Sequence, residues 1–157
     1  MPELRLLDLL RSLDEADIEF LVFGAVALAF YGHVRATADL DIIVHRTPSN
    51  HERLIEWLAQ RDAHLALNPE RPFGPNEAAS LRRGANATLL LDLGQLDIVQ
   101  HLPGLAPWDH LSANAEEYDF EGLLLRTVDR QTLIRRKRAR GTPQDLSDVA
   151  ALERLED

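Results

Sequence analysis

Two aspartates one residue apart, inside an otherwise apolar run, constrain this chain more than any other feature. Asp39 and Asp41 lie in the segment DLDIIV, which follows a short stretch of small residues opened by Gly24. Aspartate is a poor strand former, and a buried carboxylate is costly unless solvent, a cationic side chain or a metal compensates for its charge. Because alternate side chains of a strand project from one face, we expect the two carboxylates to point together and their apolar neighbours to point into the opposite layer.

The length and composition indicate one folded domain, residues 1–157. The chain is long enough for a substantial core and short for two independent domains. Apolar residues make up 45% and charged residues 27%, as in globular rather than disordered proteins. The sequence contains no cysteine, which excludes disulfides and thiolate metal sites.

Charge and hydropathy narrow the possible partners. The first ten residues lack the basic-then-apolar order of a signal peptide, and every apolar segment is too short to span a bilayer. We therefore predict a cytoplasmic protein with no membrane partner. A net charge of −9 argues against a general nucleic-acid coat, because phosphate backbones bind positive surfaces. Six basic residues nevertheless gather in residues 130–140, as either a solvated helix face or a local phosphate-attracting patch.

Hydrophobic periodicity and turn residues predict alternating helices and strands. Expected helices cover residues 2–16, 25–32, 49–61 (with Ser49 as the N-cap), 108–117, 130–140 (capped by Asp129) and 143–155. Expected strands cover residues 18–23 and 39–45, two strands in 87–102 around a turn at Gly94 and Gln95, and a hairpin in 118–128 that turns at Glu121 and Gly122. Residues 68–77 contain three prolines and are expected to form an irregular loop. The sum predicts an α+β domain, with a mixed β-sheet flanked by helices and a C-terminal helical pair.

A third aspartate completes a candidate metal site. Asp97 lies in the short apolar run GQLDIV, whereas the rival Asp92 lies close to the expected turn. Three carboxylates from neighbouring strands can hold two divalent cations, and Mg²⁺ is commonly held by carboxylates together with substrate phosphates. Asp97 would help to hold the cation on the nucleophile side and could accept the proton of an attacking hydroxyl. At Gly24 a phosphate could approach the backbone amides closely.

Two segments resemble a known family. Residues 24–41, GAVALAFYGHVRATADLD, are similar to the signature of the DNA polymerase β superfamily of nucleotidyltransferases, roughly Gly-Gly-x-Ala, then Gly, then Arg-x-Thr-x-Asp-x-Asp. They look most like its minimal bacterial members and the AbiE-type toxin nucleotidyltransferases. Residues 133–152, LIRRKRARGTPQDLSDVAAL, resemble the final motif of that group, a lysine-bearing helix followed by Pro-x-Asp-Leu-x-Asp. The resemblance covers most of the chain and implies a nucleotidyltransferase fold.

The resemblance also implies an activity, namely transfer of a nucleoside monophosphate from an NTP to a hydroxyl, with release of pyrophosphate. It implies roles for eight residues: metal ligation and catalysis by Asp39, Asp41 and Asp97 with two Mg²⁺ ions, a phosphate cradle at Gly24 and Ala25, a loop shaped by Arg35 and Thr37, and contact with the triphosphate by Lys137. Two positions depart from the pattern. Ala25 stands where a second glycine or a serine is usual, and Thr142 where an arginine is common.

Several alternatives stay open. The acceptor is either RNA, such as the 3′ end of a tRNA bound by the basic helix around Lys137, or a small hydroxylated compound. Ala25 also suits a catalytically weak nucleotidyltransferase-fold module that acts with an antitoxin partner in a toxin–antitoxin pair. His33 is expected to face solvent, with contact to the substrate as the lesser alternative. Asp145 and Asp148 are expected to cap and solvate the last helix, with the lesser alternative that Asp145 orients Lys137.

Overall fold

The structure is a computed structural model that describes residues 3–155 of the chain. Its helices are α1 (Leu6–Glu15), α2 (Gly24–Phe30), α3 (Pro48–Gln60), α4 (Pro75–Arg82), α5 (Trp108–Asn114), α6 (Arg130–Arg140) and α7 (Pro143–Leu155). Its strands are β1 (Phe20–Phe23), β2 (Asp39–Val44), β3 (His64–Leu65), β4 (Asn68–Pro72), β5 (Ala87–Leu91), β6 (Gly94–Val99), β7 (Glu116–Phe120) and β8 (Leu123–Thr127). Each helix in this range is too short or too polar to cross a membrane.

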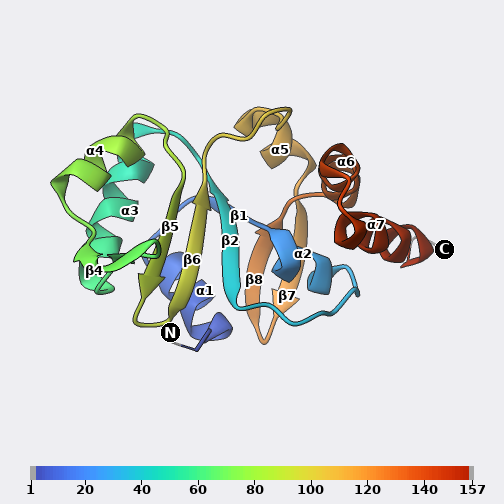
Figure 1. The fold of residues 1–157 in the computed structure, drawn as a ribbon, viewed down its shortest axis with the longest axis horizontal. Coiled ribbons are helices and arrows are strands. Elements are labelled where there is room, and N and C mark those ends of the chain that lie inside the picture. Colours follow the sequence, from blue (N-terminus) through green and yellow to red (C-terminus); the bar gives the residue numbers. More distant parts are fainter. Residues whose placement is uncertain (1–2, 156–157) are drawn as a thin grey trace.

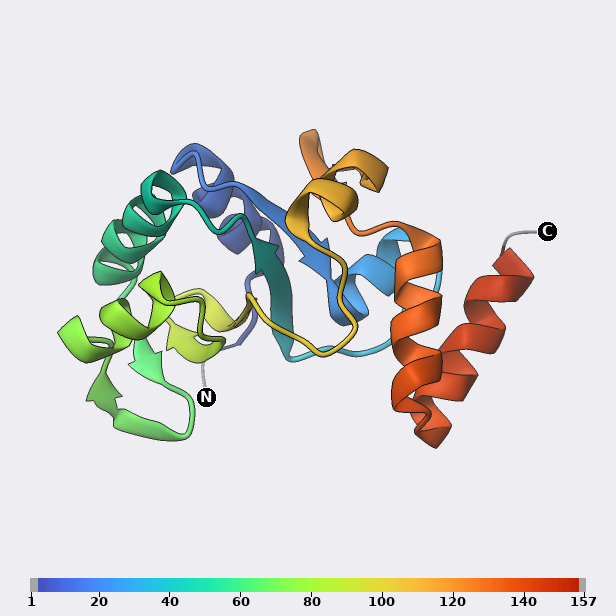
Figure 2. The ribbon, with the colours of Figure 1, turned by 90° about the horizontal axis from the view of Figure 1, so that it is seen from above.

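The strands form one mixed sheet in the order β4-β3-β5-β6-β2-β1-β8-β7. In its centre, β2 pairs antiparallel with β1 and parallel with β6. Figure 1 shows α1 behind the sheet and α2 in front of it, with α6 and α7 side by side at one end. Figure 2 shows, from above, how the C-terminal pair projects beyond the sheet. The expected α+β class, mixed sheet and C-terminal helical pair are confirmed.

The alternation of side chains in β2 divides the core from the site. Leu40 and Ile42 are completely buried in the hydrophobic core, whereas Asp39 and Asp41 are only partly buried on the other face. The strand β6 repeats this pattern, since Leu96 and Ile98 are buried and Asp97 between them is partly exposed. The apolar members of both strands therefore fix which face carries the carboxylates.

The predicted loop over residues 68–77 is wrong, because this segment forms β4 and the start of α4. β4 is an edge strand, where a proline can occupy a position that needs no N–H donor. Pro75 lies in the first turn of α4, where the missing N–H also costs little, and Glu77 accepts a hydrogen bond from the Gly74 amide at 3.3 Å. Prolines at these positions permit regular structure.

Other boundaries also differ from the predictions. Residue 2, where the first helix was expected to begin, lies outside the described residues, and α1 begins at Leu6. Thr47, rather than Ser49, caps α3, since its side chain accepts a hydrogen bond from the Asn50 amide at 3.2 Å. Gly94 belongs to β6, so the turn before that strand lies at residues 92–93. The hairpin turn at Glu121 and Gly122, the Asp129 cap and the bounds of α7 agree with the predictions.

Candidate active site

Three carboxylates meet on one face of the central sheet. Asp41 and Asp97 are register partners across the parallel pair β2–β6, and Asp39 lies two residues before Asp41 on the same face. One oxygen atom from each carboxylate can be chosen so that all three atoms lie within 4.8 Å of one another. The rival Asp92 lies in the turn before β6 and forms an ion pair with Arg61 at 3.6 Å. The structure thus brings together the three acids that the sequence singled out.

The carboxylates are held in a state that disfavours their charge. Burial, followed by the neighbouring Asp97 carboxyl, raises the pKa of Asp39. Burial, the largest effect, and the charge of Asp39 raise the pKa of Asp41, although a hydrogen bond with Asp97 and the charges of Arg140 and Lys137 act in the opposite direction. Burial and Asp41 likewise raise the pKa of Asp97. Three partly desolvated like charges repel, and a divalent cation among them would relieve that repulsion.

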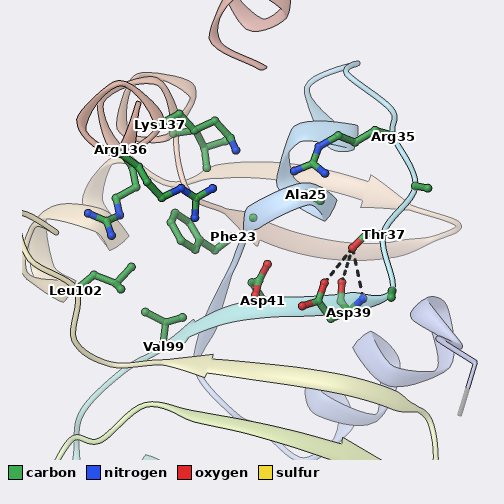
Figure 3. Close-up of a pocket in the computed structure, with 15 residues that line it drawn as sticks. Phe23, Ala25, Arg35, Thr37, Asp39, Asp41, Val99, Leu102, Arg136 and Lys137 are labelled. Atoms are coloured by element: carbon green, nitrogen blue, oxygen red, sulfur yellow. Dashed lines mark hydrogen bonds between the residues drawn. The ribbon is translucent and has the colours of Figure 1, made fainter. Parts of the chain in front are cut away.

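Thr37 fixes the first of these acids. Its hydroxyl oxygen lies 3.1 Å from Oδ1 of Asp39 and 2.9 Å from the Asp39 carbonyl oxygen, and the Asp39 amide reaches it at 3.4 Å. Figure 3 shows these contacts at the edge of the cavity. Thr37 therefore helps to orient the first residue of β2.

Asp39 and Asp41 line a cavity of about 430 Å³, whereas Asp97 lies beside them and does not line it. Its lining includes seven of the eight predicted site residues: Gly24, Ala25, Arg35, Thr37, Asp39, Asp41 and Lys137. The other lining residues are Phe23, Ala36, Ala38, Val99, Leu102, Leu133, Arg136 and Arg140. Figure 3 shows Lys137 and Arg35 extending toward one another above Ala25, with Asp39 and Asp41 below. One wall is therefore negative and the opposite wall is positive.

The turn between β1 and α2 comes very close to β2, the strand that carries Asp39 and Asp41. Gly24 has a φ of +64°, in the left-handed region that favours glycine, and a Cβ on it would lie 2.0 Å from Oδ2 of Asp41. A side chain is thus excluded both by the backbone conformation and by space. Ala25 follows at the start of α2 and lines the cavity, so the departure from the usual glycine or serine is accommodated without filling the site.

Two acids in the last helix, Asp145 and Asp148, are placed differently from the expectation. Asp145 and Asp148 are completely buried, not solvated. Asp145 does serve the N-terminus of α7, because it accepts hydrogen bonds from the amide and hydroxyl of Thr142 at 3.1 and 2.7 Å. Asp148 instead lies 2.9 Å from the ammonium nitrogen of Lys137. Three-residue spacing on a helix places these acids on one face, and this was the signal available in the sequence.

His33 is also placed differently from expectation. Its Nε2 lies 2.9 Å from Oδ1 of Asp148, and its side chain is only 24% exposed. The expectation of a solvent-facing histidine is wrong because the loop before β2 folds back onto α7. The fold therefore joins two parts of the chain that the sequence showed as separate motifs.

The basic segment 130–140 is largely engaged within the protein. Its partners are Glu153 for Arg138, Asp145 for Arg140, Asp148 for Lys137, the Pro103 carbonyl for Arg136 and the Thr132 hydroxyl for Arg135. Arg130 lies over the ring of Tyr31, with 5.2 Å from its guanidinium carbon to the ring centroid. Neither earlier interpretation fits fully, since the segment is neither a simple solvated face nor a free cationic patch.

Solved structures share this fold. The lincosamide antibiotic adenylyltransferase LnuA, with lincomycin bound, has a TM-score of 0.64 at 13% identity, over 96% of this chain and 95% of that one. An antigenic nucleotidyltransferase-like protein from Paracoccidioides brasiliensis has a TM-score of 0.61 at 17% identity, over 92% and 72%. ANT(2'')-Ia, in complex with adenylyl-2''-tobramycin, has a TM-score of 0.55 at 12% identity, over 94% and 88%. The sequence itself matches no family model and no curated protein. The chain therefore has the fold of nucleotidyltransferases.

Proposed function

We propose that this chain is a metal-dependent nucleotidyltransferase of the cytoplasm, which transfers a nucleoside monophosphate from an NTP to a hydroxyl and releases pyrophosphate. The observation that carries the proposal is the division of the cavity. Asp39 and Asp41, which converge with Asp97, line one side, and Lys137 and Arg35 stand on the other. A triphosphate that brings divalent cations matches both sides, and the shared fold supports this reading. We also propose that, among nucleotidyltransferases, this chain is close to the AbiE-type toxins.

The donor set fits magnesium. Asp39, Asp41 and Asp97 offer only carboxylate oxygens, which hard divalent cations prefer, and their raised pKa values indicate a site short of positive charge. These residues would hold two Mg²⁺ ions. When bound, the ions lower the pKa of the attacking hydroxyl and neutralise charge on the triphosphate.

The remaining groups bind and orient the reactants. The acceptor oxygen attacks the α-phosphorus, the bond from that phosphorus to the pyrophosphate oxygen breaks, and the hydroxyl proton passes to Asp97. The backbone at Gly24 and Ala25 lies where a phosphate can approach closely. Lys137 and Arg35 would bind the departing phosphates. Such catalysis relies on positioning and on charge stabilisation of the transition state.

We further propose a small hydroxylated compound as the acceptor in preference to RNA or tRNA. A polyanionic strand needs free cations, whereas the basic side chains of α6 are mostly committed to contacts within the protein. LnuA is by name an adenylyltransferase for lincosamide antibiotics, and ANT(2'')-Ia is seen with an adenylylated tobramycin. Both names describe small hydroxylated acceptors.

The test incubates the protein with each labelled NTP and Mg²⁺, and with either total RNA or a metabolite extract. Label is expected in the small-molecule fraction, with little loss of acceptor use when salt is raised. Asp97→Asn should abolish transfer, whereas Asp92→Asn, a matched acid in the same hairpin, should retain it. Transfer to RNA that falls steeply with salt would reverse the choice of acceptor. NTP binding without any transfer would instead favour the weak module with an antitoxin partner.

A further inference from the structure

Lys137 is the only lysine of the sequence, beside sixteen arginines. Its side chain is only 9% exposed, although it ends in an ammonium group. The nitrogen lies 2.9 Å from Oδ2 of Asp148 and 3.6 Å from Oδ1 of Asp145. A buried ammonium is costly without such partners, so these two carboxylates determine the position of the Lys137 nitrogen.

Asp148 also contacts the loop that leads into β2. Besides Lys137, it is approached by Nε2 of His33 at 2.9 Å, by Nη2 of Arg35 at 3.5 Å and by Nε2 of Gln144 at 2.9 Å. One buried carboxylate thereby joins α6, α7 and the loop before β2. Burial alone would raise its pKa, but hydrogen bonds from Lys137, Gln144 and His33 outweigh that effect and lower the pKa of Asp148. The carboxylate is therefore charged at neutral pH.

The charged side chains around Asp148 have an excess of positive charge next to the cavity, because three cations accompany two carboxylates. Asp145 is already matched by Arg140, whose Nε and Nη2 donate hydrogen bonds to it at 2.8 and 2.7 Å. The single charge of Asp148 is then shared between Lys137 and Arg35. Among residues 3–155, no group forms a hydrogen bond with the buried Nε of Arg35, although Arg35 lines the cavity. Arg35 thus retains a donor that no described residue uses, and Lys137 lines the same cavity.

We infer that Asp148 is a positioning residue, which anchors the ammonium of Lys137 and the guanidinium of Arg35 against one wall so that both face the phosphates of a bound nucleotide. The inference rests on the proposed function for the identity of that ligand. Lys137 and Arg35 are about a hundred residues apart in sequence, and each has a long flexible side chain. A shared buried carboxylate removes much of the conformational freedom that nucleotide binding would otherwise have to restrict.

The first measurement needs no nucleotide. Because the chain has one lysine, an amine-selective acetylating reagent labels only Lys137 and the α-amino group, which mass spectrometry separates. Asp148→Asn should increase the rate of Lys137 acetylation about fivefold or more, since the ammonium loses its buried partner. Glu153→Gln is the matched control on the same helix, because it removes the exposed acid that pairs with Arg138. Its effect on Lys137 labelling should be negligible.

The second measurement is steady-state transfer. Asp148→Asn should raise KM for the NTP about tenfold or more and change kcat much less, because saturating nucleotide can restore the positions of the cations. In a Lys137→Met background the same substitution should have a clearly smaller effect, since part of its action passes through Lys137. If Asp148→Asn does not fold, Asp148→Glu keeps the charge and should give intermediate labelling and KM.

The outcomes separate the inference from the proposed function. Unchanged labelling of Lys137 in the Asp148 variant overturns the anchor, even if wild-type protein transfers nucleotide. An equal loss in kcat, or full additivity with Lys137→Met, shows a merely structural role and overturns it as well. Altered labelling in a protein that binds no NTP keeps the anchor geometry but overturns its assignment to nucleotide phosphates, together with the proposed function.

Discussion

A Cβ atom on Gly24 would lie 2.0 Å from Oδ2 of Asp41. The glycine that turns β1 into α2 is therefore in contact with the carboxylate that faces the cavity from β2. Its φ of +64° adds a second, independent requirement for glycine. The turn motif and the acid motif, which are separate in sequence, form one packed unit in the structure.

We predict that Gly24→Ala displaces Asp41 and lowers transfer about 100-fold or more, because small shifts of a catalytic group are costly. The strained φ should also cost about 1–3 kcal/mol of folding stability. Ala25→Gly is the control, since it changes the neighbouring residue without a clash and should cost no more than about 1 kcal/mol. Transfer rates and thermal unfolding measure both effects. A fully active Gly24→Ala protein would contradict the proposed contact.

The raised pKa values of the three acids predict an unusual pH dependence. A carboxyl whose folded-state pKa lies above its unfolded value binds protons more tightly in the folded protein. Its cost to stability is absent below the ordinary pKa and appears as the pH rises through the raised value. In chelator at about pH 8, Asp41→Asn should therefore be more stable than wild type, with Tm about 2–4 °C higher per kcal/mol of relieved repulsion.

The same Tm measurement, repeated with Mg²⁺ in place of the chelator, tests whether the carboxylates bind the metal. Addition of Mg²⁺ should raise the Tm of the wild-type protein and leave that of Asp41→Asn nearly unchanged, because binding to the folded state stabilises it by mass action. Asp92→Asn, which leaves the cluster intact, should respond to Mg²⁺ as wild type does. Equal Mg²⁺ responses in all three proteins would show that the carboxylates do not form the metal site.

Asn50 is predicted to be important for stability, although it is remote from the cavity. It is completely buried, accepts a hydrogen bond from the Glu19 amide at 2.8 Å and donates to the carbonyls of Glu19 and His45 at 3.0 and 2.8 Å. Asn50→Ala removes three hydrogen bonds and leaves the Glu19 amide without its acceptor, although the carbonyls of Glu19 and His45 keep the amides of His45 and Thr47 as donors. At about 1 kcal/mol for each lost bond, the substitution should cost about 3 kcal/mol. Urea unfolding measures this loss. Asn114→Ala, which removes one exposed hydrogen bond to His110, should cost far less.

The ion pair of Asp145 is predicted to make part of the folding stability sensitive to acid. Hydrogen bonds from Arg140, the largest effect, and from Thr142 lower the pKa of Asp145 well below its ordinary value, although burial acts against them. A depressed folded-state pKa adds stability above the unfolded pKa, and this stability is lost as the pH falls through the folded value. Asp145→Asn should thus be less stable than wild type at neutral pH. The difference should shrink steadily in unfolding curves below about pH 4, whereas a constant difference would exclude the ion pair as its cause.

Much of the fold and the meeting of the acids could be predicted because the deciding signals are local. The alternation in DLDIIV and GQLDIV determines which side chains share a face, and the apolar neighbours determine which face is buried. The same flanking residues separated Asp97 from Asp92. Residues 68–77 were misjudged because proline excludes regular structure only at positions that need its missing N–H, and sheet edges and helix starts do not.

The sequence by itself determined most of the elements and the common face of Asp39 and Asp41. Only the tertiary structure decided that Asp148 is buried between Lys137 and the loop of His33 and Arg35. The physical reason is that periodicity reports neighbours along the chain, whereas burial and charge pairing depend on which distant segments pack together. The sequence pattern around a helical carboxylate is the same whether the side chain is exposed to water or buried beside a cation.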